Sequence, residues 1–382
     1  MTYPLEGLCI LDLSQAISGP FAGRMLTDLG ADVVRVEWPR GDVSNAFGQK
    51  VGGITGLFTQ MNAGKRGISA DLASTAGVAL IARLAARADV LIENFRPGVL
   101  DRAGLGFDTL SATNPGLVML SISGFGATSP ESQRQAYAPV IHAESSLLTR
   151  QAAFDDRPAT DLALALADSL ASLHGTVALL AALNLRTRTG TGQHIDLSML
   201  DAMVATDDYA HYAADGVYDF GPQRGEIWDA VGGPVMVAGD PKLTWVRVSK
   251  HAGLADPAPD ADVATKIAAR HDAIAAWIAS FPDRAALTAE LVAANLPWAD
   301  MRTASTLLDS PSLQARKVVA SVDDGEGGQR QVIRMPYRFS DAECGVRGAA
   351  PVAGRDNEEV LADWLGLTES ETASLRVDGA LG

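Results

Sequence analysis

Short apolar runs alternate with helical patterns over residues 1–199, and this alternation is the feature that most constrains the fold. A first run at 8–13 is followed by a helical pattern that ends at Leu29-Gly30, and a second run follows at 32–37. Pro20 suits the first turn of that helix, and Gly30 suits its C-terminal cap. Further runs lie at 89–93, 117–123 and 193–199. Repeated strand–helix–strand units build a parallel sheet that presents ligands at the carboxyl ends of its strands, so we expect an α/β fold.

From residue 200 onward the pattern changes to that of a smaller domain. Residues 231–237 have the pattern of a strand pair around Gly232-Gly233, and residues 243–248 have the pattern of another strand. An Ala-rich helical pattern covers much of 260–295. Together these features predict a small α+β domain over residues 226–305.

Asp168 stands at the start of a long Ala/Leu helical pattern that runs to Arg186, and no cation lies next to it in the sequence. One interpretation is a helix N-cap, whose carboxylate accepts backbone N–H groups of the first turn. The other is a carboxylate held in apolar surroundings, where it can serve as a nucleophile or a base. This segment alone leaves both interpretations open.

Two arginines flank a turn after the expected strand at 89–93. Arg96 and Arg102 lie on either side of Pro97-Gly98 in a chain whose formal net charge is −15. They are either solvated or placed to bind a phosphate or a nucleotide base at the strand end. The same net charge argues against a nucleic-acid partner and against an anionic membrane.

Several other chemistries lack their motifs. The sequence contains no H-E-x-x-H, C-x-x-C or G-x-S-x-G, and Gly64-Lys65 lacks the upstream glycine of a phosphate-binding loop. The histidines show no metal-ligand spacing, so no metal site is expected. Glu37 ends the second run and could bind the ribose of a nicotinamide cofactor, but Gly19 stands alone, without the G-x-G-x-x-G fingerprint. A nicotinamide-dependent oxidoreductase therefore stays an alternative without its main motif.

The two cysteines, Cys9 and Cys344, lie at opposite ends of the chain. This placement favours free thiols in a reducing compartment. The N-terminus lacks the charged and apolar regions of a signal peptide, and no apolar run approaches the roughly 18 residues of a membrane span. We therefore expect a cytoplasmic protein without a membrane partner.

A set of short motifs extends over nearly the whole chain in a distinctive order. The motifs are Ser18-Gly-Pro20 with Leu29-Gly-Ala-Asp-Val33, Glu93-Asn-Phe-Arg-Pro-Gly98 with Leu100-Asp-Arg102, Ser123-Gly-Phe-Gly126, Ala167-Asp168 and Thr189-Gly-Thr-Gly-Gln193. Their order and spacing resemble those of the class III CoA-transferases. This is the CaiB/BaiF family, which includes formyl-CoA transferase and, as a side branch, the α-methylacyl-CoA racemases.

The resemblance implies a fold and an assembly. Members are homodimers of two interlocked, ring-like subunits, each with a large Rossmann-like domain built from both chain ends, a small domain and two long linkers. Applied to this chain, the large domain comprises 1–199 and 335–382, the small domain 226–305, and the linkers 200–225 and 306–334.

The resemblance also implies a reaction, with Asp168 as the catalytic carboxylate. In transferase members this group attacks an acyl-CoA thioester to give an aspartyl-acyl anhydride, and the released CoA thiolate then forms an aspartyl-CoA thioester. A carboxylic acid accepts the CoA through a second anhydride. A carboxylate is a weak nucleophile, so this chemistry needs a dry, oriented site. Acyl-CoA enters as a substrate, and no tightly bound cofactor is expected.

Further positions correspond to the family's CoA contacts. The residues expected to contact CoA are Ala16, Ile17, Arg40, Asn94, Phe95, Arg96, Val99, Arg102, Tyr137 and Met199. The chain departs from formyl-CoA transferase at Trp38, where that enzyme has arginine, and at Gln135, where it has lysine. A glycine-rich lid is represented only by Gly232-Gly233. These departures weaken the expectation of a formyl/oxalate substrate pair.

Two further readings of the same motifs remain open. A racemase would need a histidine opposite Asp168, but Tyr137 holds that position, and the ordinary pKa of a tyrosine, near 10, makes it a weak base. His142 follows five residues later, where a helix would turn it another way. A non-catalytic acyl-CoA binding protein is the remaining hypothesis, and it predicts CoA binding without exchange.

Overall fold

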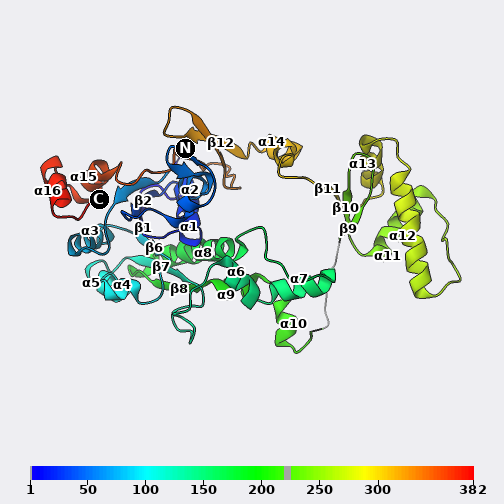
Figure 1. Ribbon diagram of the computed structural model, residues 1–382, viewed down its shortest axis with the longest axis horizontal. Helices are drawn as coiled ribbons and strands as arrows, with labels where there is room; N and C mark the ends of the chain where they lie inside the picture. The colour runs from blue at the N-terminus through cyan, green and yellow to red at the C-terminus, as the bar shows by residue number, and fades with distance from the viewer. Residues whose placement is uncertain (1, 219–224) are drawn as a thin grey trace. The chain divides into compact units, whose positions relative to one another are not determined.

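The computed structural model describes residues 2–218 and 225–382, which belong to two compact units (Figure 1). The large unit comprises Met1–Ala210 and Lys317–Gly382, and the small unit comprises His211–Arg316. Residues 200–210 and 317–334, which the sequence places in linkers, thus lie in the large unit. Part of the expected linker at 200–225, including Gly221-Pro222, lies outside the described residues.

A six-stranded parallel sheet forms the centre of the large unit and confirms the α/β class. From one edge to the other its strands are β5 (Arg66–Ser69), β2 (Asp32–Glu37), β1 (Cys9–Asp12), β6 (Val90–Glu93), β7 (Val118–Ser123) and β8 (His194–Ser198). Numbered along the chain within this sheet, the strand order is 3-2-1-4-5-6. This is the order of Rossmann folds, in which ligands bind where the order reverses, here between β1 and β6.

Both faces of the sheet are buried, because successive residues of each strand point to opposite faces. Ile10 of β1 packs with α1 (Ser18–Asp28) and α8 (Leu166–Thr189) in one core cluster. Leu11 packs with α3 (Thr75–Ala85) and α15 (Asn357–Leu365) in another. With both faces covered, the ends of the strands are the places where the sheet can meet a ligand.

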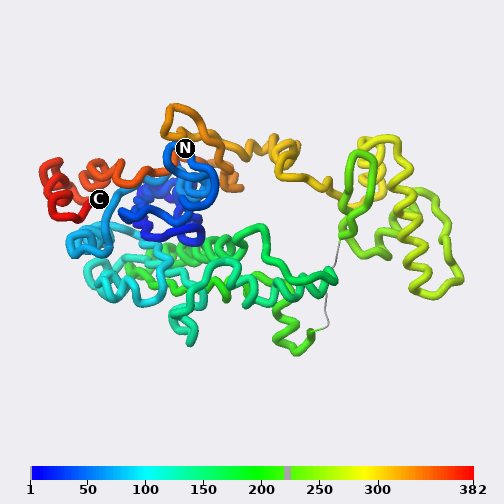
Figure 2. Tube along the Cα trace, viewed as in Figure 1, coloured from blue at the N-terminus to red at the C-terminus, as the bar shows by residue number. Residues whose placement is uncertain are grey.

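The two ends of the chain meet in the large unit. The blue N-terminal strands and the red C-terminal helices α15 and α16 (Glu369–Val377) belong to the same unit (Figure 2). A bridge joins Ala70 to Leu381, and α15 packs on β5. The C-terminal segment therefore completes the core behind the first strands.

Helix α8 is apolar enough, and long enough, to cross a membrane by length and composition, but 50% of its apolar window is buried inside the fold. It packs on α1, on β7 and on α9 (Met199–Thr206). Its composition is thus explained by packing in a protein core. Within residues 2–218 and 225–382, no other helix meets the same criterion.

Shorter elements complete the large unit. They are η1 (Val43–Ala46), β3 (Lys50–Val51), β4 (Ile54–Thr55), α2 (Gly56–Asn62), α4 (Val99–Arg102), α5 (Phe107–Thr113), α6 (Ala138–Glu144), α7 (Leu147–Asp155), β12 (Val319–Asp323) and β13 (Gln329–Ile333). Strands β12 and β13 form an antiparallel pair, as do β3 and β4.

The small unit combines a three-stranded antiparallel sheet with helices. The sheet has the order β11 (Trp298–Asp300), β10 (Val235–Ala238) and β9 (Gly225–Trp228). The helices are α11 (Pro241–Ala252), α12 (Val263–Ala279), α13 (Arg284–Ala293), η2 (Leu307–Asp309) and α14 (Pro311–Ala315), with α10 (Ala210–Ala214) at the boundary of the units.

The strand predicted at 243–248 is wrong, because these residues lie in α11. Asp240 caps this helix by accepting the backbone N–H groups of Lys242 and Leu243, and Pro241 occupies its first turn. Buried Trp245 and Val248 are three residues apart and share one face. The alternating apolar residues of 243–248 resemble a strand pattern, but the helix start signal, Asp240-Pro241, lies just upstream.

A network of buried charges lies beneath the end of β1. The Lys65 ammonium is 2.7 Å from an Asp12 carboxylate oxygen, and neither side chain is exposed. Lys65 also donates to the Pro20 carbonyl at 2.9 Å and to the Asn62 side-chain oxygen at 2.8 Å. Burial lowers the pKa of Lys65 to about 8. At Asp12, burial is opposed by the charges of Lys65 and Arg35 and by hydrogen bonds from Lys65 and Ser14, which together lower the pKa of that carboxyl. The network joins β1 to the segment that precedes β5.

Replacing the buried cation tests this network. We expect Lys65→Met to destabilise the large unit by about 3–5 kcal/mol, because it leaves the Asp12 carboxylate buried without its counter-charge. Urea unfolding followed by circular dichroism measures the change. Adding Asp12→Asn to the same chain should recover part of the loss, and Lys50→Met, at an exposed position, should change stability by less than about 0.5 kcal/mol. Equal unfolding midpoints for the two lysine variants would contradict the network's role.

Candidate active site

A cavity of about 170 Å³ is lined by loops from the carboxyl ends of β1, β6 and β7, and so includes the place where the strand order reverses. Its walls come from the loops after these strands, from the segment before α6 and from the first turns of α8 and α9. The lining residues are Ala16, Ser18, Asn94, Phe95, Arg96, Pro97, Ile122, Ser123, Gly124, Ser132, Arg134, Gln135, Ala136, Tyr137, Asp168 and Met199. This is the position at which open α/β sheets bind ligands.

Asn94 holds the two central loops together. Its side-chain oxygen accepts the Gln15 backbone N–H at 2.8 Å, and its side-chain nitrogen donates to the Gln15 carbonyl at 2.8 Å. The same nitrogen donates to the Ser18 hydroxyl at 3.1 Å. These paired bonds fix the distance between the loop after β1 and the loop after β6, and therefore the width of the cavity.

Ala16 occupies a strained conformation on the cavity wall. Its φ of 62° lies in the left-handed region, which disfavours residues with a side chain. The Ala16 N–H donates to both oxygens of Asp42 at 3.3 Å. Arg35 and the Ser44 backbone N–H hold the Asp42 carboxylate in turn. Buried charge thus keeps the loop in a conformation that it would otherwise leave.

Asp168 is the third residue of α8, whose N-cap is Ala165, so the N-cap interpretation is wrong. The residue is only 9% exposed, and the backbone N–H and the hydroxyl of Ser18 lie beside its carboxylate. Burial raises the pKa of Asp168, and the polar groups of Ser18 offset part of that rise. A carboxylate at the wall of a cavity, oriented and poorly hydrated, is suited to nucleophilic attack.

Glu93 lies at the end of β6, directly before Asn94, and was missed as a candidate although it begins one of the sequence motifs. Its carboxylate accepts the Phe95 N–H at 2.8 Å. It also lies beside Ser121, whose hydroxyl is 2.9 Å from His194 Nε2. Burial raises the pKa of Glu93 to about 7. The Glu93 side chain thus holds the start of the loop after β6. Its position at the end of a strand was the sequence signal that could have identified Glu93 as a candidate.

Most of the residues predicted to contact CoA lie together. Ala16, Asn94, Phe95, Arg96, Tyr137 and Met199 line the cavity with Asp168. The others do not line it: Ile17 is the N-cap of α1, Val99 and Arg102 are the first and last residues of α4, and Arg40 lies on an exposed turn. Ser18 was missed, although it lines the cavity beside the Asp168 carboxylate and lowers the pKa of that group.

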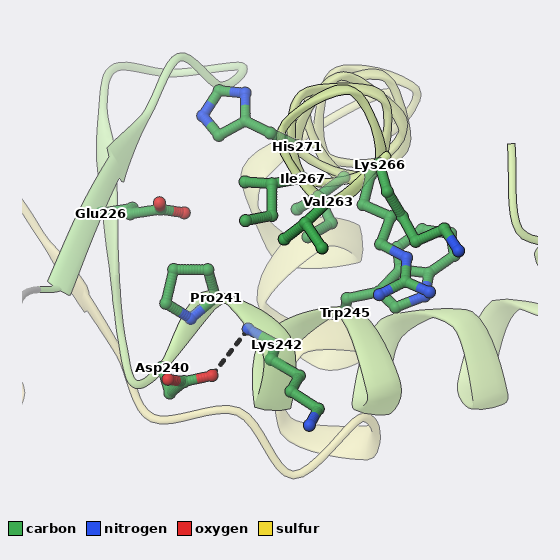
Figure 3. A pocket seen from close by; sticks show the side chains of 11 residues that line it. Glu226, Asp240, Pro241, Lys242, Trp245, Val263, Lys266, Ile267 and His271 are labelled. Atoms are coloured by element: carbon green, nitrogen blue, oxygen red, sulfur yellow. Dashed lines mark hydrogen bonds between the residues drawn. The ribbon is translucent and has the colours of Figure 1, made fainter. Parts of the chain in front are cut away.

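A second cavity, of about 440 Å³, lies in the small unit between β9, α11 and α12 (Figure 3). Its apolar walls include Trp245 and Ile267. Several of its polar groups are bound within the unit: Asp240 caps α11, Arg270 pairs with Asp256 at 2.6 Å, and Lys266 donates to a backbone carbonyl. None of the predicted site residues lines this larger cavity. Among the residues that the structure describes, no cluster of histidine, cysteine and acidic side chains could hold a metal ion.

Comparison with known proteins gives a consistent result. The model of CoA-transferase family III matches residues 5–357. The succinyl-CoA–D-citramalate CoA-transferase of Chloroflexus aurantiacus is 31% identical over 391 residues, which cover 98% of this chain and 97% of the relative. The formyl-CoA:oxalate CoA-transferase of Streptomyces avermitilis is 30% identical over 414 residues, which cover all of both chains.

A solved structure extends the similarity to the fold. A CAIB/BAIF family protein from Brucella suis superposes with a TM-score of 0.80 at 30% sequence identity. The match covers 95% of this chain and 100% of that one.

The buried Glu93 carboxyl makes a test of the site's electrostatics. Its pKa is raised from 4.5 to about 7 in the folded protein, so folding favours the protonated form and stability falls as pH rises through this range. We expect Glu93→Gln to be more stable than the wild type by roughly 1–3 kcal/mol at pH 8. The difference should disappear at pH 4, where both folded and unfolded states are protonated.

Urea unfolding at a series of pH values measures this difference. Glu326→Gln, on an exposed turn, is the matched control and should show no comparable dependence on pH. A Glu93→Gln variant whose stability follows that of the wild type at every pH would show that the buried carboxyl carries no such penalty.

Proposed function

Because the chain belongs to CoA-transferase family III, we propose that it moves CoA from an acyl-CoA thioester to a free carboxylic acid through covalent intermediates on Asp168. One observation carries the assignment of the nucleophile. The Asp168 carboxylate is buried, lies beside the polar groups of Ser18 and lines the cavity at the reversal of strand order. Ligands of open α/β sheets bind at that place.

The first half of the reaction loads CoA onto the enzyme. An Asp168 oxygen attacks the thioester carbonyl, the new C–O bond replaces the C–S bond, and CoA leaves as a thiolate. The thiolate then attacks the aspartyl carbonyl of this anhydride. The donor acid departs as a carboxylate, and an aspartyl-CoA thioester remains.

The second half repeats these steps with the acceptor. The acceptor carboxylate attacks the aspartyl thioester and forms a second anhydride, again releasing the CoA thiolate. The thiolate attacks the acceptor's acyl carbonyl, which yields the new acyl-CoA and restores the Asp168 carboxylate. No water and no net proton enter the cycle, so a water molecule in the cavity can only divert an intermediate to hydrolysis.

The residues around Asp168 suit these demands. Ser18 orients the carboxylate, and Ala167 and Ala171 of α8 add apolar bulk in the adjoining core. Poor hydration raises the reactivity of the carboxylate, as its raised pKa indicates. Orientation and dryness together compensate for the weak nucleophilicity of a carboxylate.

Three exposed arginines can receive the phosphates of CoA. Arg40, Arg96 and Arg102 have no ion-pair partner among residues 2–218 and 225–382. In a chain of net charge −15, an unpaired guanidinium group at a cavity favours an anionic ligand. We assign Arg96 the main contact, because it alone of the three lines the cavity.

The same proposal covers substrates and assembly. The relatives act on pairs of carboxylic acids or their CoA thioesters, as their names state, and we propose small carboxylic acids as donor and acceptor here. Helix α8 exposes Leu173, Val177 and Leu180 along one side, a stripe that fits a second subunit in the proposed interlocked homodimer. A cytoplasmic location stays a prediction from the sequence.

No specific observation favours the racemase alternative. His142 does not line the cavity, and both of its ring nitrogens are bound within the fold, to Asp161 and to the Ala167 N–H. Tyr137 lines the cavity but is a weak base at neutral pH. Among the residues that the structure describes, the pair of opposed bases that racemisation needs is therefore not assembled around Asp168.

Replacing the nucleophile tests the mechanism. We expect Asp168→Asn to reduce CoA transfer on the order of a thousand-fold or more while CoA still binds, because no covalent intermediate can form. The assay incubates the protein with succinyl-CoA and a panel of carboxylic acids and follows the new thioesters by chromatography. Hydroxylamine or borohydride trapping with mass spectrometry should place the label on Asp168. The exposed Asp208→Asn is the control, and transfer retained by Asp168→Asn would overturn the mechanism.

Replacing the phosphate-binding arginine tests the binding mode. We expect Arg96→Gln to raise KM for acyl-CoA by about 10- to 100-fold with little change in kcat, because a charge-assisted hydrogen bond is worth about 1.5–3 kcal/mol. Steady-state kinetics at two salt concentrations measures both constants. Arg188→Gln, an exposed position at the far end of α8, should leave them unchanged. A loss confined to kcat would show that Arg96 does not bind the phosphates.

A further inference from the structure

The buried His142 side chain joins α6 to the start of the helix that carries Asp168. Its side chain is 1% exposed, and it does not line the cavity. We propose that His142 is a positioning residue for Asp168, and that its imidazole replaces the missing N-cap side chain of α8. This inference rests on the proposed function, in which Asp168 is the nucleophile.

The partners of the two ring nitrogens identify the tautomer. Nε2 lies 3.2 Å from the backbone nitrogen of Ala167, and Nδ1 lies 2.8 Å from a carboxylate oxygen of Asp161. A backbone N–H can only donate, so Nε2 accepts. Nδ1 then carries the hydrogen and donates it to Asp161. The imidazole is thus neutral and held at both ends, with its acceptor turned toward α8.

Helix α8 needs such an acceptor. The first backbone N–H groups of a helix have no partner within the helix, and side chains at the N-cap usually accept them. The N-cap of α8 is Ala165, which has no acceptor in its side chain. His142 accepts the N–H of Ala167, the residue directly before Asp168. The backbone directly before the proposed nucleophile is therefore hydrogen-bonded to a side chain of α6, and not to a side chain of the N-cap residue of α8.

Helix α6 begins after Tyr137, which lines the cavity, and its His142 binds the residue directly before Asp168, so one short helix links the cavity wall to the start of α8. Without the His142 contact, the first turn of α8 can fray, and the Asp168 carboxylate moves away from Ser18. A misplacement of about 1 Å at a reacting group can cost about 100-fold in rate. Because His142 contacts neither cavity nor ligand, we expect the loss in kcat and not in KM for acyl-CoA.

Two conservative variants separate this role from simple packing. The side-chain oxygen of Gln reaches the position of the imidazole Nε2 and can accept the Ala167 N–H, whereas the shorter Asn reaches only the position of Nδ1 and keeps the bond to Asp161. We expect His142→Gln to retain kcat within a few-fold. We expect His142→Asn to lose about 100-fold in kcat at unchanged KM.

A second measurement does not depend on catalysis. Hydrogen exchange of the peptide amides at the start of α8 should be fast in His142→Asn and as slow in His142→Gln as in the wild type. The control is His174→Asn, which removes an exposed histidine of α8 that bonds to Thr206. If the Asn variant does not fold, His142→Leu takes its place, since it fills the space and accepts no hydrogen bond.

The outcomes distinguish this inference from the proposed function. Equal kcat in the Gln and Asn variants, a loss confined to KM, or unchanged exchange at the start of α8 would each overturn the positioning role. A wild-type protein that transfers no CoA would overturn the proposed function instead. The exchange experiment would then still decide whether His142 caps α8.

Discussion

The reversal of strand order between β1 and β6 is the constraint on which the site depends. Helices cover both faces of the parallel sheet, so a ligand can meet it only at the strand ends. At the reversal, the chain leaves β1 and β6 in opposite lateral directions and opens a crevice. Asn94 spans that crevice with its paired hydrogen bonds to Gln15. The position of the cavity thus follows from the strand order, and its width follows from the hydrogen bonds of the Asn94 side chain.

Buried charge keeps the rim of the crevice in place. Asp12 with Lys65, and Asp42 with Arg35, are ion pairs removed from water, and each carries additional hydrogen bonds. Such pairs contribute little net stability, but they penalise any arrangement that separates them. Asp42 uses this rigidity to hold the strained Ala16 against the cavity. We interpret these ion pairs as groups that fix the conformation of the loop beside the cavity.

The proposed nucleophile, Asp168, combines burial with restraint. A carboxylate that is too well solvated attacks a thioester poorly, and one that is buried without partners destabilises the fold. Asp168 lies between these extremes, because it is buried in α8 but has the polar groups of Ser18 beside its carboxylate. In its proposed role, His142 also restrains the backbone at the start of α8, directly before Asp168. The raised pKa values of Asp168 and Glu93 show that burial is costly on both sides of the loop after β6.

The sequence by itself determined the alternation of strands and helices and the motifs of the family, because periodicity and turn residues are local properties. It also predicted Asp168 and Arg96 as site residues by their positions in those motifs, and both line the cavity. Only the tertiary structure decided that 243–248 is helical, that Asp168 lies inside its helix, and that Arg40 and Arg102 lie off the cavity wall. The roles of Ser18, Glu93 and His142 likewise depend on partners distant in the chain. Burial and hydrogen bonding between distant segments are set by packing, and no local pattern records them.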